Sequence, residues 1–165
     1  MAAAATKFGS LKNYEKGGVV AINDDPKHYV FSNVFDVASK SKPYERVVVG
    51  LNVKYTMEAT RAEGDSPWYA CSHDEAAIVM DGEVEVHLIK PDQPLVPESK
   101  EGAIKLGAAP AGKNMGWLKA RRGHMALLPK GSAYQFRVKG EPGVLLIQSM
   151  LGDCSLQRWA EICQK

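Results

Sequence analysis

Three side chains with metal-binding or proton-transfer chemistry stand at alternate positions in one short stretch. Cys71, His73 and Glu75 follow each other at i, i+2 and i+4, and on a regular strand this spacing puts all three on one face. A thiolate, an imidazole and a carboxylate together suit a soft metal ion. The same stretch also fits a simpler interpretation, in which Cys71 is a small buried residue, His73 a hydrogen-bonded or surface histidine and Glu75 a paired carboxylate.

A second stretch carries a spacing of glycines and proline. Five residues separate Gly123 from Pro129, and one residue separates Pro129 from Gly131. Tyr134 follows three positions after Gly131. This spacing resembles the second cupin motif, in which the glycine, proline and glycine precede a metal-binding histidine. Tyr134 stands at the histidine position, and a phenol with its usual pKa of about 10 is a poor metal ligand at neutral pH.

The end of the first cupin motif is also matched. Glu75 and Gly82 have the expected six residues between them, but the motif's two histidines fall at Tyr69 and Cys71, or one position earlier, where no histidine stands. An open metal site needs about three protein ligands, so the sequence predicts that this chain holds no metal. The degenerate motif positions are Tyr69, Cys71, Glu75 and Tyr134.

The sequence pattern predicts that the elements positioning these residues are mainly strands. Residues 46–52 include three consecutive valines, a pattern of buried strands, and residues 53–60 alternate as a half-buried strand does. Within residues 76–89, Asp81-Gly82 predicts a tight hairpin turn. Residues 125–138 form a second strand–turn–strand unit and 143–150 one more strand, whereas residues 28–37 fit either a strand or a helix.

The two ends and one internal segment differ from this pattern. Leu156, Trp159, Ala160 and Cys163 follow a helical period, which predicts a C-terminal helix over 155–164. Residues 1–15 read as an N-terminal arm, and residues 91–116 as a long loop rich in Pro, Gly, Ala and Lys. One helix after many strands predicts a single all-β domain over residues 1–165. The expected fold is a cupin-type double-stranded β-helix, a jelly-roll barrel with a C-terminal helix.

The charge, hydropathy and cysteine content of the sequence argue against several classes of protein. The net charge of the 165 residues is +2 and the basic residues are scattered, unlike the footprint of a nucleic-acid binder. We expect no membrane segment, since no apolar run approaches the ~18 residues of a spanning helix, and no secretory signal at the N-terminus. Three cysteines without paired zinc spacing fit a reducing cytoplasm better than a disulfide framework.

Three segments resemble one enzyme family. They are "SPWYACSHDEAAIVMDGEVEVHLIK" (66–90), "DDPKHYVFSNVFDVASKSKPYE" (24–45) and "GHMALLPKGSAYQFR" (123–137). All are similar to the small subunit of the two-component bacterial hydroquinone 1,2-dioxygenases. The resemblance implies a non-catalytic chain without a cofactor of its own, in a hetero-tetramer with a large cupin subunit that holds Fe(II). That enzyme opens hydroquinone with O2 to 4-hydroxymuconic semialdehyde.

In this interpretation the chain stabilises the large subunit and helps to complete its substrate pocket. Trp68 and His73 are the candidates for reaching the substrate, because an indole stacks on an aromatic ring and an imidazole hydrogen-bonds to a phenolic hydroxyl; core packing is the other interpretation of Trp68. Two alternatives from other classes stay open. One is a stand-alone metal enzyme that uses Cys71, His73 and Glu75, and the other is a non-catalytic cupin with a small-molecule pocket.

Overall fold

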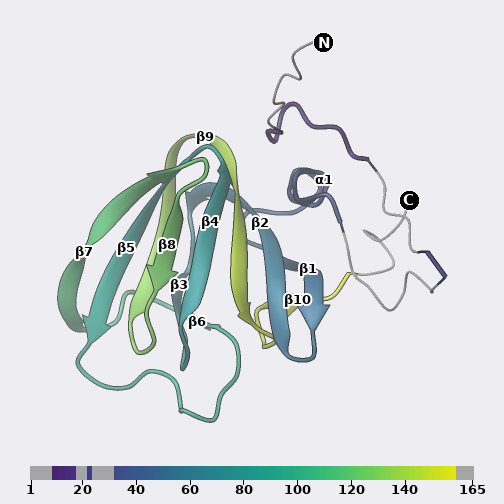
Figure 1. The fold of residues 1–165 in the computed structure, drawn as a ribbon. Coiled ribbons are helices and arrows are strands. Elements are labelled where there is room, and N and C mark those ends of the chain that lie inside the picture. Colours follow the sequence, from purple (N-terminus) through teal and green to yellow (C-terminus); the bar gives the residue numbers. More distant parts are fainter. Residues whose placement is uncertain (1–8, 18–21, 24–31, 159–165) are drawn as a thin grey trace.

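Ten strands and one short helix form the part of the chain that the computed structural model describes, residues 9–17, 22–23 and 32–158. The helix α1 spans Val34–Ser39. Its N-cap residue is Asn33, whose side chain accepts hydrogen bonds from the first-turn amides. The strands are β1 (Arg46–Asn52), β2 (Tyr55–Asp65), β3 (Trp68–Ala70), β4 (Glu75–Asp81), β5 (Glu83–Pro91), β6 (Ile104–Leu106), β7 (Gly112–Arg121), β8 (Met125–Leu128), β9 (Ala133–Met150) and β10 (Ser155–Leu156). They belong to one mostly antiparallel sheet that curls into a half-barrel (Figure 1).

The long strand β9 joins the two walls of this curled sheet. Its first part pairs with β3 and β5, and its second part pairs with β2 and β4. Beyond these partners, β1 and the short parallel strand β10 extend one wall, while β7 extends the other through β5. Residues from β3 and β4 therefore face the same interior as residues from β9, which lies far from them in the sequence.

The Asp81-Gly82 turn is a corner between the walls, and the predicted hairpin is wrong. The strand β4 before it pairs with β8 and β9, whereas β5 after it pairs with β7 and β9. Gly82 has φ +80°, and a Cβ there would lie 2.9 Å from the Cα of Gly143. A glycine meets both needs of this corner, a left-handed backbone and a close crossing of two chain segments.

The second strand–turn–strand unit behaves in the same way. The turn at Pro129-Lys130-Gly131 separates β8 from β9, but β8 pairs with β4. Residues 143–150, expected as a separate strand, are the second part of the continuous β9. Both turns were thus located correctly, while the pairing of their strands follows from the folding of the whole sheet.

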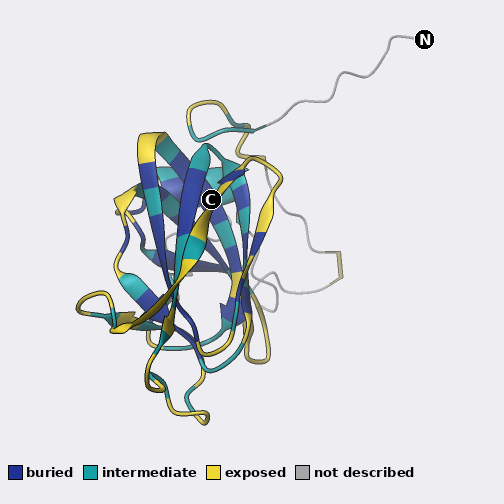
Figure 2. Cartoon of the chain, turned by 90° about the vertical axis from the view of Figure 1, so that its left-hand side faces the viewer, coloured by how far each residue is buried: buried dark blue, intermediate teal, exposed yellow. Residues whose placement is uncertain are grey.

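Two apolar clusters lie on the two faces of the sheet. The larger cluster fills the interior and includes Tyr69, Tyr134, Phe136 and Leu145. The smaller cluster forms where α1 covers the outer face of β1, β2 and β9, with Val37 packed near Val47 (Figure 1). Figure 2 shows the same distribution, with buried residues along the strands and exposed ones at the connecting loops.

The predictions for the ends and the long loop need correction. Ser155 and Leu156 form β10 beside β1, so no helix begins there; the remaining helical positions, Trp159, Ala160 and Cys163, lie outside the described residues. The range 91–116 contains β6 and the start of β7, which pair with β3 and β5 and so hydrogen-bond backbone groups that a loop leaves unpaired. Among the described residues, no helix is long and apolar enough to cross a membrane.

The part of the predicted N-terminal arm that is described is attached to the sheet. The Leu11 amide donates to the Asp81 carboxylate at 2.8 Å, and the Tyr14 hydroxyl donates to Asp36 on α1 at 3.1 Å. Residues 1–8 lie outside the described part. The segment that follows them therefore helps to fix α1 and the Asp81-Gly82 corner.

Candidate functional site

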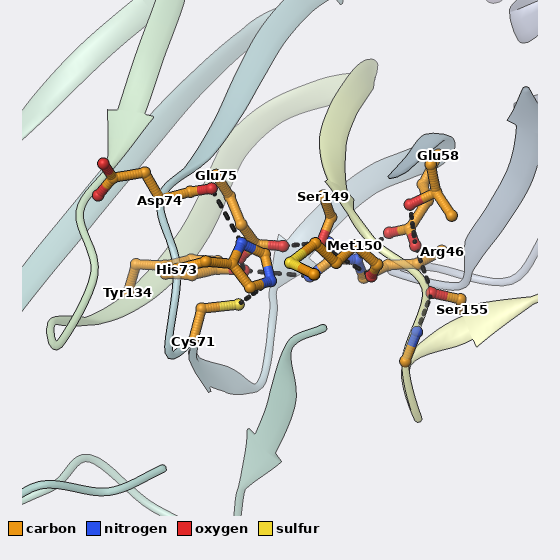
Figure 3. A network of polar contacts seen from close by, with 12 residues as sticks. Arg46, Glu58, Cys71, His73, Asp74, Glu75, Tyr134, Ser149, Met150 and Ser155 are labelled. Atoms are coloured by element: carbon orange, nitrogen blue, oxygen red, sulfur yellow. Dashed lines mark hydrogen bonds and ion pairs between the residues drawn. The ribbon is translucent and has the colours of Figure 1, made fainter. Parts of the chain in front are cut away.

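The four degenerate motif positions come together inside the half-barrel. Glu75 begins β4 and Tyr134 lies near the start of β9, and the Tyr134 hydroxyl donates a hydrogen bond to Glu75 Oε2. Tyr69 on β3 lies opposite Tyr134 in the strand register, and their rings stack with centroids 5.5 Å apart. Cys71 is buried beside them. The motif spacing therefore identified a real spatial cluster (Figure 3).

An arginine at the start of β1 is the centre of this cluster. Arg46 Nη2 donates to Glu75 Oε1 at 2.6 Å, and Nη1 donates to the Tyr134 hydroxyl at 3.1 Å. Nε donates to Glu58 Oε2 at 2.5 Å, while the guanidinium lies 5.7 Å from the centre of the Tyr69 ring. Only 3% of Arg46 and 1% of Glu75 are exposed to solvent, so these are buried, charge-assisted hydrogen bonds.

Hydroxyl groups donate hydrogen bonds to the second carboxylate of the cluster, that of Glu58. Glu58 Oε1 accepts from Thr56 at 3.1 Å and from Ser155 of β10 at 2.5 Å. Ser155 in turn accepts from the Gly152 amide. The network thus connects β1, β2, β4, β9 and β10 (Figure 3).

The neighbouring charges fix the protonation states of the network. Burial by itself raises the pKa of Glu75, but Arg46 and hydrogen bonds from Ser149 and Tyr134 lower that pKa below its usual value. Burial and the nearby Glu75 raise the pKa of Tyr134 well above that of a free phenol. Glu75 is therefore a carboxylate that accepts hydrogen bonds, and Tyr134 is a protonated donor.

The residues present do not fit a metal ion. Both oxygens of Glu75 are engaged, one by Arg46 and one by Tyr134. Burial raises the pKa of the Cys71 thiol far above its usual range, which disfavours the thiolate that a metal binds. Within the described residues, no three His, Cys, Asp or Glu side chains are grouped to hold a metal ion. The stand-alone metal enzyme of Cys71, His73 and Glu75 therefore loses its structural basis.

His73 lies at the edge of this cluster, in the connection from β3 to β4. Its Nε2 is 3.8 Å from the Cys71 sulfur, and its Nδ1 is 3.0 Å from the carbonyl oxygen of Asp74. A carbonyl oxygen can only accept, so Nδ1 is the donor of this hydrogen bond. The imidazole is half-buried and oriented by its own loop (Figure 3).

Trp68 occupies the other face of β3. It lies beside Leu106 of β6 and is half-buried. Because side chains alternate along a strand, Trp68 points away from the face on which Tyr69 meets Tyr134. Trp68 is not a member of either buried cluster.

A cavity of about 440 Å3 opens where the ends of β3 and β5 meet the corner before β9. Cys71 lines it, and Trp68 and His73 do not. The wall of the cavity comes from three segments, residues 70–72, residues 90–96 with Glu98, and residues 130–132. Its size is in the range of small-molecule sites.

Arg46 and Glu58 were not anticipated from the sequence. Arg46 precedes three valines in a strand that reads as buried, and Glu58 belongs to the polar set of an alternating strand. In the structure that polar set, Thr56, Glu58 and Thr60, is buried and faces the interior, while Ala59 on the other face packs near α1. A charged residue next to buried-strand residues was the signal available, but its partner on another strand depends on the sheet pairing.

These features define a class of protein: a mostly β chain with a cupin-like motif frame, in which an arginine holds the positions where metal ligands are expected. No protein-family model and no curated protein matches the chain. Solved structures do match it, and two of the most similar are chains of one kind of enzyme. A chain of hydroquinone 1,2-dioxygenase PnpCD in complex with Cd2+ and 4-hydroxybenzonitrile is 52% identical over 99% of this chain and 98% of its own length, with a TM-score of 0.90. A chain of hydroquinone 1,2-dioxygenase from Sphingomonas sp. TTNP3 with 4-hydroxybenzoate bound is 52% identical over 98% of both chains, with a TM-score of 0.91.

The chain therefore belongs to the hydroquinone 1,2-dioxygenase family, as its sequence segments predicted. It corresponds to the small subunit of these enzymes. A second chain, from the PnpCD enzyme in complex with Fe3+, is 14% identical with a TM-score of 0.59, over 81% of this chain but 36% of its own length. That match shows a shared fold with part of a much longer chain.

Proposed function

We propose that this chain is the accessory small subunit of an O2-dependent hydroquinone ring-cleaving dioxygenase, with a cupin-type double-stranded β-helix as its fold. The observation that carries the proposal is the 52% identity over nearly the full length of small chains from two hydroquinone 1,2-dioxygenases. In the proposed assembly, a hetero-tetramer in the cytoplasm, a large cupin subunit holds the iron. Hydroquinone is opened there to 4-hydroxymuconic semialdehyde.

The chemistry of the buried cluster supports an accessory role. Ring opening with O2 requires a redox metal with open coordination positions, and the partner's iron supplies it in this proposal. The motif residues of this chain are instead held by Arg46. The chain then contributes by stabilising the large subunit and by closing its pocket against water, which orients the substrate.

We place Trp68 and His73 on the substrate side of the assembly. Trp68 is half-buried outside both apolar clusters, so its indole is free to pack on a partner or an aromatic ring. His73 is half-buried in the connection from β3 to β4, with an oriented ring. An imidazole there can hydrogen-bond to a phenolic hydroxyl after its Nε2 leaves Cys71.

Co-purification tests the partnership. A tagged copy of this chain, purified from cells that also express its natural partner, is expected to co-purify with an iron-containing chain of roughly twice its size. Size-exclusion chromatography with light scattering should give a mass that requires both chains. A tagged chain that elutes alone at every expression level, with no iron in its fractions, would contradict the proposed assembly.

A second candidate function has one observation in its favour, the cavity of about 440 Å3 lined by Cys71. Its volume suits a non-catalytic small-molecule site. Calorimetric titration of the isolated chain with hydroquinone distinguishes the two functions. Saturable one-to-one binding to the chain alone would favour the binding module, and the accessory proposal expects none.

A further inference from the structure

The buried cluster contains two carboxylates and one guanidinium, and the guanidinium pairs with both carboxylates. Glu58 and Glu75 are both nearly inaccessible to solvent, and both contact the guanidinium of Arg46. The second contact lies at the two positions that match the cupin motifs, Glu75 and Tyr134. A cation therefore faces the residues that would face a metal ion in a metal-binding cupin.

We propose that Arg46 is a built-in cation that takes the place of a metal ion in this chain and closes this part of the interior to metals. The inference goes beyond the proposed function, because it concerns what fills the barrel of this chain whatever partner the chain has. It assigns Arg46, Glu58, Glu75 and Tyr134 to one structural unit.

The geometry favours a cation that is fixed in place. A guanidinium presents a planar fork of N–H donors and stays charged at any physiological pH. Arg46 uses three of its nitrogens toward three different strands: Nε to β2, Nη2 to β4 and Nη1 to β9. A metal ion cannot enter between these groups without displacing the side chain.

The surroundings show why the cation is needed. A buried carboxylate without a positive partner is strongly destabilising, whereas replacing a whole buried ionic group by neutral residues is often tolerated. Hydroxyl donors reach both carboxylates, Thr56 and Ser155 at Glu58 and Tyr134 at Glu75, but they carry no charge. Removal of Arg46 alone therefore leaves two carboxylates without a positive partner, and removal of all three charges does not.

This contrast defines the test. Thermal melting is measured on the full chain for the wild type, Arg46→Met, Arg46→Lys, and the triple variant Arg46→Met/Glu58→Gln/Glu75→Gln. We expect Arg46→Met to lower Tm by roughly 10 °C and the triple variant to recover most of that loss. Arg46→Lys, which keeps the charge but not the fork, is expected to fall between the wild type and Arg46→Met. If Arg46→Met is too unstable to purify, the yield of soluble chain replaces Tm in the comparison.

A second readout concerns metal. The wild type, dialysed against Zn2+ and then against metal-free buffer, should retain far less than one Zn2+ per chain in elemental analysis. Retention of one Zn2+ per chain that is lost in Glu75→Gln would overturn the proposal. So would a triple variant no more stable than Arg46→Met, because the loss would then come from packing and not from uncompensated charge.

Discussion

At the scale of single residues, the buried Glu75 carboxylate makes stability depend on pH. The pKa of Glu75 is lowered in the folded chain because the attraction to Arg46 and its hydrogen bonds outweigh the effect of burial. A lowered folded pKa contributes stability above the unfolded value of about 4.3, and this contribution is lost as pH falls through the folded pKa. Acid should therefore weaken the network from the carboxylate side.

We expect Glu75→Gln to lower the free energy of unfolding by about 3–5 kcal/mol at pH 7, because it breaks a buried ion pair from one side. The gap to the wild type should shrink as pH falls below the unfolded pKa of about 4.3, because the carboxylate then takes up a proton first in the unfolded chain and only at lower pH in the folded chain. Urea unfolding of both chains from pH 7 to pH 3 measures this. Ser72→Ala, at a half-buried hydroxyl outside the network, serves as a control. A gap that stays constant over this range would show that Glu75 is not ionised in the folded chain.

Trp68→Ala separates a pocket role from a core role. If the indole meets the substrate side, assembly should survive and kcat/KM for hydroquinone should fall roughly threefold to tenfold, since a stacking contact is worth about 0.5–1.5 kcal/mol. A core tryptophan would instead cost about 3–5 kcal/mol of stability. Melting curves and oxygen-uptake kinetics of the reconstituted enzyme distinguish these outcomes. Trp117→Ala is the matched control, because Trp117 is 56% exposed on β7, where it stacks on His87.

At the scale of elements, the sequence predicted most strands but not their partners. The valine run of β1 was recognisable because burial imposes it locally. The alternation of β2 indicated a strand correctly, although its polar set is the one that faces the interior. The Asp81-Gly82 turn was located correctly but interpreted as a hairpin, because a left-handed glycine suits a tight turn and a corner equally. The motif positions Glu75 and Tyr134 were recognised, whereas Arg46 and Glu58 were missed because their meeting depends on long-range pairing.

The corner at Gly82 provides a test of this packing. Gly82→Ala is expected to destabilise the chain more than Gly123→Ala does. Both glycines have positive φ, +80° and +84°, which costs a non-glycine residue about 1–2 kcal/mol, but only the Cβ at 82 meets another segment, 2.9 Å from the Gly143 Cα. Chemical denaturation of the two variants gives the comparison. Equal losses would mean that the crossing of the two backbones is loose.

At the scale of the whole molecule, the outer face of the sheet is covered unevenly. The helix α1 packs on β2 and β9 of this face, while Met125 and Leu127 on β8, which β4 separates from β9, are 68% and 59% exposed. They lie beside the half-buried Ile78 and Ala76 of β4 in the strand register. Contiguous exposed apolar side chains of this kind favour association.

We therefore expect the isolated chain to self-associate and the double variant Met125→Ser/Leu127→Ser to do so less, with little change in Tm because both side chains are already exposed. Val53→Ser is the control, since Val53 is highly exposed between β1 and β2. Light scattering as a function of concentration measures the effect. A wild-type chain that stays monomeric at high concentration would contradict this expectation.

In the function that we propose, this chain supports ring cleavage without performing it. Oxygen uptake with hydroquinone and added ferrous iron tests the claim most directly, on this chain, on the iron-bearing large chain and on the two together. The account predicts no uptake by this chain alone and far higher uptake by the pair than by the large chain alone, because an incomplete pocket leaves substrate poorly oriented and open to water. Full turnover by this chain alone, or by the large chain with no gain when this one is added, would contradict it.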